Sequence, residues 1–553
     1  MPDRITVSVI QHRLVGIVQE MGEVMLRTAY SQILNSSRDF STSVFDGQGR
    51  LVAQAEHVPI HVGALPAAVE AVRSAFPGSI DPGDLFILND PYHGGSHLPD
   101  VTILRPIFVG TKLAFWAVTR AHQADIGGAT HGGYNAAATE IWQEGLRITP
   151  LKLRQRGEIR NDILHFIAAN VRHERDFIGD LDAMIGSTNV AERRLLRFVD
   201  EYGVDTITEV IGEILASAER RTRACIATWR DGVFYGESAL DDDGHGAVDI
   251  HVRAKVTKEG DHLVVDLSES DPQVKGFINS SYPNTISAVH MAFSYLIDPD
   301  VPKNEGTFRP VAVKAKPGTV VWPHAPAAVA NCTTHCGQEI AEAVVKALSQ
   351  SCLDRVFAGW SKRFRTAIRG VDPRTSHPFI WHIFHARGGG GASPAGDGWA
   401  LVGGLITGGG VRFGSVEVSE VRAPLFFKRH EFRADSGGVG QFRGGTGGVL
   451  ELRIETAEPA VANTAGDGVR HAPYGLFGGE PGATHYNRLI SKGETRVLKT
   501  KEVGIPVQPG DWLIVESSGG GGYGDPAQRD PRLVEADLRD GLVTRGASGR
   551  TGG

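Results

Sequence analysis

The chain has 553 residues and a formal net charge of -7. Its 57 lysines and arginines are spread along the sequence and form no basic run, which argues against a nucleic-acid-binding protein. No apolar run approaches the ~18 residues of a membrane span, and four cysteines are too few for a disulfide framework.

The N-terminal part mixes helix-like and strand-like segments. Residues 10–25 place apolar side chains at helical spacing among polar ones, so they predict a core-facing helix and not a signal peptide. We therefore expect a cytoplasmic protein. Short strand-like runs follow, namely "STSVFD", "GRLVAQA", "LFILND" and "LAFWAVT", before long amphipathic segments at 161–229. Together they predict an α/β domain over residues 1–244.

Composition changes twice further along the chain, and length alone predicts roughly three domains. Residues 245–430 alternate strand-like and helix-like segments, beginning with a hairpin whose turn contains "KEGD", and predict a middle α/β domain. Residues 431–553 predict a β-rich, glycine-rich domain. The 69 glycines follow no fixed period, so tight turns and bulges explain them better than a repeat. The predicted fold class is α+β and multi-domain.

Several familiar catalytic motifs are missing. The sequence contains no G-x-x-x-x-G-K-[ST] phosphate loop, no G-x-S-x-G elbow and no H-E-x-x-H helix, so it predicts no familiar nucleotide site. Cys332 and Cys336 are spaced as CxxxC, but two ligands without a second cysteine pair fall short of a structural zinc motif. Buried free thiols are the favoured interpretation.

Potential ligands for a hard metal ion are concentrated between residues 39 and 144. They are Asp39, His57, His61, Asp90, His93, His97, Asp100, His122, Asp125, Glu140 and Glu144. Imidazoles combined with carboxylates suit Mn, Fe or Zn. "LFILND" and "LAFWAVTRAH" each run from an apolar strand into a polar cluster. We expect them to be neighbouring strands that deliver both clusters to the same edge of a sheet.

These residues differ in how strongly they indicate a metal site. Polar side chains at the ends of apolar runs are costly to bury without a partner, which favours a metal role for His97, His122 and Asp125. An ordinary structural role is favoured for His57. Asp90 fits a ligand and an Asx-turn equally well.

The loop "NDPYHGGSHLPD", residues 89–100, has neither helical nor strand periodicity. Its Gly94-Gly95 pair allows a sharp fold that brings the backbone close to an ion. We expect Asp100 to brace the end of this loop before the strand that begins with "VTIL".

Five motifs then indicate a family. In chain order they are "RDFSTSVFDGQGRLVAQAEHVPIHVGALP", "GDLFILNDPYHGGSHLPDVTIL", "ATEIWQEGLRI", "DSGGVGQFRGGTGG" and "GGGGYGDP". The chain resembles the B subunit of the ATP-dependent hydantoinases and 5-oxoprolinases, a family that includes N-methylhydantoinase and caprolactamase. The large subunits of acetone and acetophenone carboxylases are more distant relatives.

The resemblance implies a site that holds a divalent transition metal, Mn, Zn or Fe. Its metal ligands would be Asp39, His97, His122 and Asp125, with Asp39 added by the resemblance alone. His93 or Glu144 would handle protons during catalysis.

Three further residues would lie around this site. Glu140 would lie behind the metal ligands, in contact with them, or against the substrate. The segment "GATHGGYNAA" departs from the family's pattern and adds His131 and Tyr134 at the pocket's edge, which bears on substrate identity.

The resemblance also implies a hetero-oligomer. An ATPase A subunit would bind ATP and Mg²⁺ and phosphorylate the carbonyl oxygen of a small cyclic amide, and this chain would open the ring at its metal. No nucleic acid or membrane partner is implied. Two alternatives stay open: a subunit of an ATP-dependent ketone carboxylase, with the same pocket holding an enolate, and a non-catalytic scaffold for the ATPase.

Overall fold

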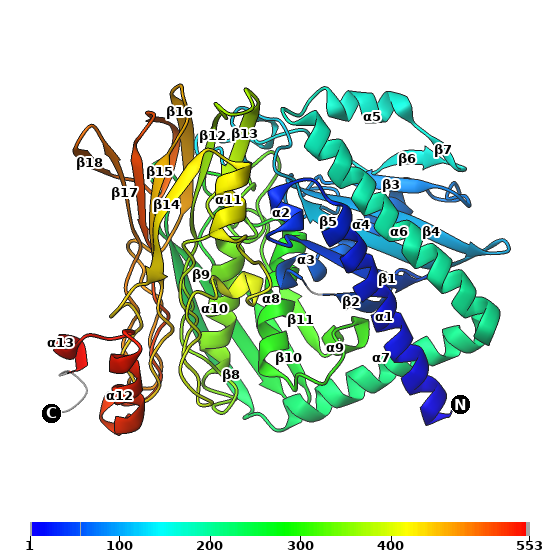
Figure 1. Ribbon diagram of the computed structural model, residues 1–553. Coiled ribbons are helices and arrows are strands. Elements are labelled where there is room, and N and C mark those ends of the chain that lie inside the picture. The colour runs from blue at the N-terminus through cyan, green and yellow to red at the C-terminus, as the bar shows by residue number, and fades with distance from the viewer. Residues whose placement is uncertain (1–2, 56, 549–553) are drawn as a thin grey trace.

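Four β-sheets organise the chain, and helices pack against them (Figure 1). The computed structural model describes residues 3–55 and 57–548. None of the helices in these ranges combines the length and apolar composition that a membrane span requires. The expected mixture of helices and strands is confirmed, and it is divided among several sheets.

The first sheet has seven strands in the order β2-β1-β5-β4-β3-β6-β7, and all neighbours are antiparallel. The strands are β1 (Phe40–Asp46), β2 (Leu51–Ala55), β3 (Leu85–Leu88), β4 (Asp100–Val109), β5 (Lys112–His122), β6 (Leu151–Gln155) and β7 (Glu158–Ile159). The predicted strands β3 and β5 are confirmed, but they are not direct neighbours because β4 lies between them. The ends of β3 and β5 and the start of β4 therefore share one edge.

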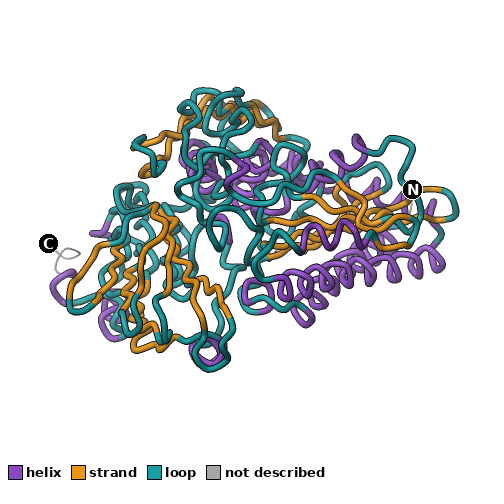
Figure 2. Tube along the Cα trace, turned by 90° about the horizontal axis from the view of Figure 1, so that it is seen from above, coloured by secondary structure: helices purple, strands orange, loops and turns teal. Residues whose placement is uncertain are grey.

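Helices cover both faces of this sheet, because successive strand residues point to opposite sides. On one face Val44 packs with residues of α1 (Arg4–Thr28), α6 (Glu174–Tyr202) and α7 (Val204–Ala227). On the other face Phe45 packs with α4 (Leu65–Ala75). In Figure 2 these long helices run beside the strands in the part that contains the N-terminus.

The second sheet has the order β11-β10-β9-β8. Its strands are β8 (Gly232–Asp242), β9 (Val248–Glu259), β10 (His262–Asp266) and β11 (Val311–Lys314). The predicted hairpin is confirmed as β9 and β10. Helix α10 (Cys336–Leu348) packs against β8 and β9, and α8 (Tyr282–Leu296) packs against α10. Contact between α10 and β8 is close at Gly236, where an added Cβ would lie 2.0 Å from the carbonyl oxygen of Ala343.

The last two sheets pack face to face. Their orders are β13-β12-β16-β19 and β14-β15-β20-β17-β18. The strands are β12 (Phe364–Val371), β13 (Pro378–His382), β14 (Leu425–Phe432), β15 (Gly448–Ile454), β16 (Ala460–Gly466), β17 (Tyr486–Ser491), β18 (Glu494–Val497), β19 (Lys501–Val507) and β20 (Trp512–Glu516). Apolar residues of both sheets share one core, including Ile368, Leu452 and Leu513.

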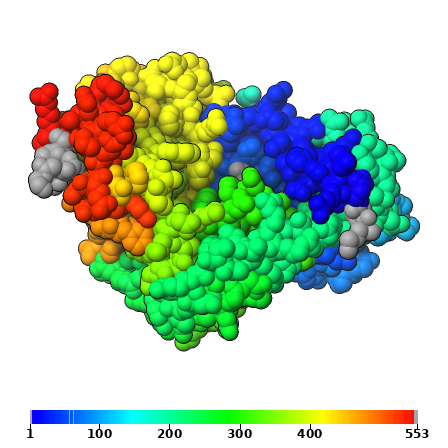
Figure 3. All heavy atoms as spheres, turned by 90° about the horizontal axis from the view of Figure 1, so that it is seen from below, coloured from blue at the N-terminus to red at the C-terminus, as the bar shows by residue number. Residues whose placement is uncertain are grey.

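Pairing of strands crosses both predicted domain boundaries. β8 and β9 lie on either side of residue 244, and β12 pairs with β16 across residue 430. The division into 1–244, 245–430 and 431–553 stays a prediction. The space-filling view from below shows the blue N-terminal residues next to the green and yellow parts, with the red C-terminal residues at the opposite end (Figure 3).

The remaining helices are short connections or caps. They are α2 (Gln32–Asn35), α3 (Pro59–Val62), α5 (Asn161–Ala168), α9 (Glu305–Phe308), α11 (Val416–Arg422), α12 (Pro531–Arg539) and α13 (Arg545–Ser548). α3 places His61 beside the edge that β3, β4 and β5 share.

Many C-terminal glycines serve close packing of extended loops. The amide of Gly445 donates to the carbonyl of Gly390 (2.8 Å), and the amide of Gly520 donates to the carbonyl of Gly445 (2.9 Å). A Cβ on Gly520 would lie 1.9 Å from the Gly390 oxygen. These three segments stack backbone on backbone, so the glycines are explained here by missing space for side chains as well as by turns.

Two glycine substitutions test the packing of α10 on β8. Gly236→Ala is expected to destabilise the protein by about 1–3 kcal/mol, because the new Cβ meets helix backbone that has to move. Gly212→Ala is the matched control: no atom lies within 4 Å of its added Cβ in α7. Alanine there is expected to add about 0.5–1 kcal/mol of stability. Urea unfolding followed by circular dichroism measures both, and equal midpoints would contradict the close contact.

Candidate metal centre

Strand register brings three polar residues to one sheet edge. His122 ends β5 and pairs with Asp100, the first residue of β4. β5 also pairs with β1, and the His122 amide donates to the carbonyl of Asp39 just before β1 (3.0 Å). Asp39, Asp100 and His122 therefore meet although they are far apart in sequence.

Hydrogen bonds from its own side chains hold the loop 89–100 in its conformation. The amide group of Asn89 donates to the Leu98 carbonyl (2.7 Å). The Asp90 carboxylate accepts from the Tyr92 amide (2.9 Å), so the Asx-turn is confirmed. Gly94 has a φ of +95°, in the region that favours glycine. The chain then folds back so closely that a Cβ on Gly95 would lie 2.1 Å from the Asn89 carbonyl oxygen.

This fold carries His97 to the sheet edge. His97 Nε2 lies 2.8 Å from Asp100 Oδ1, and His122 Nδ1 lies 3.1 Å from the same oxygen. One donor atom from each of the three residues lies within 4.8 Å of the others. Their exposures are 2%, 0% and 7%, so the group is closed to bulk solvent.

A second layer joins His61 and Asp39 to this group. His61 Nε2 lies 3.5 Å from Asp100 Oδ2 and 3.6 Å from Asp39 Oδ1. The Ser96 hydroxyl donates to Asp100 Oδ2 (2.7 Å). Burial opposes ionisation of Asp100, but His97, His61 and His122 together hold the pKa of its carboxyl well below the ordinary value. The carboxylate is therefore charged at neutral pH.

Glu144 fixes the orientation of His97 through the backbone. His97 Nδ1 contacts the Ala330 carbonyl oxygen, so this nitrogen carries the proton and Nε2 faces Asp100. The Glu144 carboxylate accepts from the Ala330 amide (2.7 Å) and the Val329 amide (3.0 Å). Burial raises the pKa of Glu144 to about 8 against these two donors. Both of its oxygens are engaged, which indicates a positioning role.

The residues present fit a transition-metal ion. Two imidazoles and one carboxylate form a donor set that suits Mn, Fe or Zn. His122 Nε2 and His61 Nδ1 are buried and have no hydrogen-bond partner among the described residues. An unsatisfied buried polar atom is costly, so an ion bound at this cluster is a physical reason for the arrangement.

The structure places other predicted site residues elsewhere. Asp125 binds Arg172, accepting from its guanidinium (2.9 Å) and its amide (2.7 Å), and it lies outside the three-residue group. His93 has a side chain that is 52% exposed and lies 3.0 Å from Asp90. The Glu140 side chain caps the 3-10 turn 141–143. These contacts give each side chain a structural partner, and none of the three lies in the metal-ligand group.

Asp100 is the main residue whose role the sequence did not reveal. We expected it to brace the loop, but it lies at the centre of the cluster. The signal that could have identified it is the spacing H-x-x-D directly before an apolar strand, which places His97 and Asp100 at one strand entrance.

His382 and Tyr134 form a wall beside the cluster. Their rings meet edge to face at 5.2 Å. Burial lowers the pKa of His382 to about 3 and raises the pKa of Tyr134 to about 12. At neutral pH the imidazole is uncharged and the phenol keeps its proton. The predicted position of Tyr134 at the edge of the pocket agrees with this geometry.

Comparison with known sequences finds relatives that match nearly the whole chain. A family described as Hydantoinase B/oxoprolinase matches residues 3–526. Caprolactamase subunit beta of Pseudomonas jessenii is 36% identical, over 98% of this chain and 94% of that protein. 5-Oxoprolinase 1 of Arabidopsis thaliana is 29% identical, over 94% of this chain but only 42% of its own length.

Comparison with solved structures gives the same result. The crystal structure of ATP-dependent caprolactamase from Pseudomonas jessenii matches with a TM-score of 0.93 at 34% identity, over 99% of this chain and 96% of that one. Nucleotide-free acetone carboxylase matches with a TM-score of 0.90 at 20% identity, over 100% and 79% of the two chains, which shows a shared fold. These matches confirm the resemblance of the five motifs, and the chain belongs to the hydantoinase B/oxoprolinase family.

Proposed function

We propose that this chain is the metal-containing subunit of an ATP-dependent cyclic-amide hydrolase, and that it opens a lactam or imide ring whose carbonyl oxygen a partner ATPase has phosphorylated. The observation that carries the proposal is the buried His97, Asp100 and His122 group in a chain 36% identical to caprolactamase subunit beta. The amide hydrolase is favoured over a ketone carboxylase, because the match to acetone carboxylase has only 20% identity.

The metal ligands we propose are His97, Asp100 and His122, with Asp39 or His61 completing the set. A divalent ion held there would supply Lewis acidity and would lower the pKa of water toward neutrality. Asp125 is absent from this revised set because both of its oxygens serve Arg172 and neighbouring amides.

The reaction balances as two additions of water. In the first, water oxygen bonds to the activated carbon, the ring C–N bond breaks, and both water protons end on nitrogen. The product is an open-chain acyl phosphate. In the second, water oxygen bonds to the acyl carbon and phosphate leaves with the electron pair of the C–O bond. One water proton ends on phosphate, the other is released, and a carboxylate is formed.

We assign proton transfer to Tyr134 and His382, the two residues that form the wall beside the cluster. The Tyr134 hydroxyl keeps its proton at neutral pH and is able to donate to the departing nitrogen. His382 is neutral and lies against Tyr134, so it is able to accept a hydrogen bond from it or from water. We do not propose this role for His93 or Glu144, because His93 is exposed and paired with Asp90 and Glu144 is fully engaged with backbone amides.

The revised ligand set is tested by metal content. His122→Ala and Asp100→Ala are each expected to lose at least ~10-fold in metal affinity, since loss of supporting contacts alone reaches that size. Asp125→Asn is the control and is expected to retain the metal. Elemental analysis after dialysis against a weak chelator distinguishes them. Full occupancy in Asp100→Ala, or loss in Asp125→Asn, would show that the ligands are chosen wrongly.

The fold of the loop 89–100 is tested at Gly95. Gly95→Val is expected to reduce bound metal and turnover nearly as far as His97→Ala, because the added side chain collides with the Asn89 and Asp90 backbone. Gly16→Val is the control, because no atom lies within 4 Å of its added Cβ in α1 and its φ is not positive. Circular dichroism confirms folding first. Normal metal and turnover in Gly95→Val would contradict the contact.

The division of labour with an ATPase predicts partner-dependent activity. The isolated chain is expected to show no ATP hydrolysis, because its sequence has no phosphate loop. Together with its ATPase partner it should show ATP hydrolysis stimulated by substrate, measured over a panel of cyclic amides and aryl ketones. Stimulation by ketones alone would favour the carboxylase, and strong turnover by the isolated chain would refute the division.

A further inference from the structure

A small pocket of unusual charge lies beside the wall of the metal centre. It is formed by the strand β12, the segment 383–388 and the glycine-rich loop near residue 404, and its volume is about 50 Å³. Its ionisable lining residues are Lys362, Arg363, Arg365, Arg387 and His485. No aspartate or glutamate lines it.

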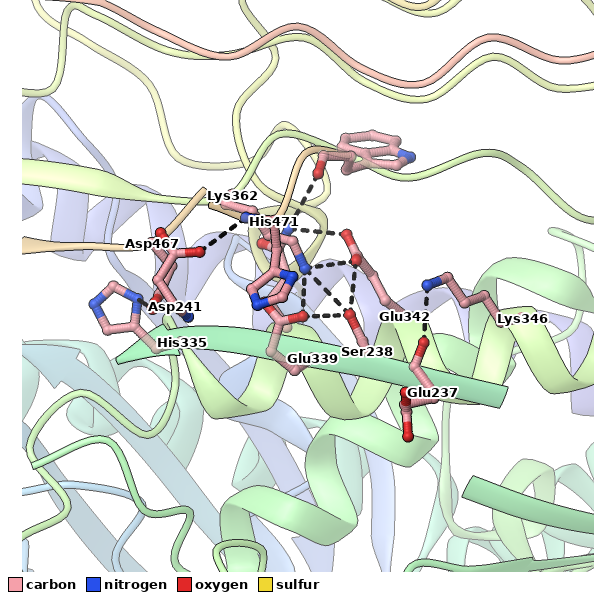
Figure 4. Close-up of polar contacts among 12 residues, drawn as sticks. Glu237, Ser238, Asp241, His335, Glu339, Glu342, Lys346, Lys362, Asp467 and His471 are labelled. Carbon is pink, nitrogen blue, oxygen red and sulfur yellow. Dashed lines mark hydrogen bonds and ion pairs between the residues drawn. The ribbon is translucent and has the colours of Figure 1, made fainter. Parts of the chain in front are cut away.

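Two of these residues bring no net charge to the pocket. Lys362 is paired with two carboxylates of α10, Glu339 and Glu342, and lies 2.7 Å from the latter (Figure 4). Burial lowers the pKa of His485 to about 4, so its ring is neutral at pH 7. The positive charge of the pocket therefore comes from its arginines.

The three arginines lack carboxylate partners. Arg365 donates to the Tyr134 hydroxyl (3.2 Å) and stacks on Phe384 with 3.6 Å between guanidinium carbon and ring centre. The side chains of Arg363 and Arg387 make no ion pair or hydrogen bond with any residue in the described ranges. Guanidinium groups do not lose their charge in proteins, so the pocket stays positively charged and is able to attract an anion.

Two other arginines show how this chain pairs such charges elsewhere. Arg443 and Arg529 share Asp537, and Arg529 also binds Asp397. Arg120 is fully buried without an ion pair, but it donates to the Thr102 hydroxyl, whereas Arg363 and Arg387 face a pocket. Burial, together with the neighbouring charge of Arg363, lowers the pKa of Arg387 to about 10.

The pocket adjoins the metal centre through Tyr134. The hydroxyl of Tyr134 accepts from Arg365 on the pocket side, and its ring contacts His382 on the side of the cluster. The negative charges of Asp39 and Asp100 act on Arg363, and that of Asp39 acts on Arg387. A substrate carbon at the metal centre would thus have the arginines on one side.

The size of the pocket restricts its occupant. One water needs about 10–15 Å³ of such volume, so the space suits a group the size of a few waters. A lactam or imide ring with its substituents would not fit. A tetrahedral anion with several oxygens matches both the volume and the fork geometry of guanidinium groups.

We propose that this pocket binds the phosphoryl group of the activated substrate, with Arg363 and Arg387 as its charged ligands and Arg365 holding Tyr134 beside it. The inference rests on the proposed function, which supplies the phosphorylated carbonyl. It adds that phosphate remains bound through both water additions, so the acyl phosphate does not escape between ring opening and final hydrolysis.

Titration with inorganic phosphate tests the pocket directly. The purified chain, stripped of metal by chelation, is expected to bind phosphate in a calorimeter, and Arg363→Gln and Arg387→Gln are each expected to bind it roughly 10- to 100-fold more weakly. Arg374→Gln is the matched control, because Arg374 pairs with Asp372 on an exposed turn after β12. Bicarbonate is titrated in parallel. Equal phosphate affinity in all variants, or tighter binding of bicarbonate than of phosphate, would overturn the proposal.

A second measurement separates this inference from the proposed function. With the ATPase partner, Arg387→Gln is expected to keep its bound metal and to hydrolyse ATP while yielding at least ~10-fold less ring-opened product per ATP. Arg387→Lys keeps the charge and is expected to lie between the two. If even the wild type opens no cyclic amide, the proposed hydrolase function is wrong, and the phosphate titration still tests the anion pocket. Unchanged product per ATP in Arg387→Gln would refute the proposed role of the pocket.

Discussion

Asp100 carries a charge in the interior of the protein, and much of the surrounding architecture follows from the need to compensate it. An isolated buried carboxylate is strongly unfavourable unless it is paired and hydrogen-bonded. Here compensation comes from His61 on α3, His97 on the loop 89–100 and His122 at the end of β5. Each of these segments must be in place before the charge is stable, so the sheet edge, the helix and the loop are energetically coupled.

The sequence predicted the parts of the site that depend on local patterns. Apolar runs ending in polar clusters identified β3 and β5 and the histidines at positions 97 and 122. What it could not show was strand register: only the pairing of β4 with β5 brings Asp100 opposite His122. Asp125 follows β5 as closely as any ligand would, but its partner Arg172 lies 47 residues away. Glu144 likewise acts on backbone that is 185 residues distant.

The fold also separates two kinds of chemistry along the chain. The proposed metal ligands lie at the edge of the first sheet. The arginines of the proposed anion pocket lie more than two hundred residues later, just before β12, within β12 and after β13. Tyr134 and His382 are where these parts touch. A chain without β12 and the segment after β13 would retain the cluster of His97, Asp100 and His122 but would lack the residues that face it.

The stack formed by Gly390, Gly445 and Gly520 has a consequence for how relatives are recognised. Two of the motifs that mark the family, "DSGGVGQFRGGTGG" and "GGGGYGDP", supply backbone to this stack and contribute no ligand to the metal cluster. Their glycines are needed for lack of space, because a Cβ on Gly445 or Gly520 would overlap neighbouring backbone. Such motifs would persist in a descendant that had exchanged its histidines and lost its chemistry. The glycine motifs therefore report the fold of a distant member, whereas positions 97, 100 and 122 report whether it keeps the proposed metal ligands.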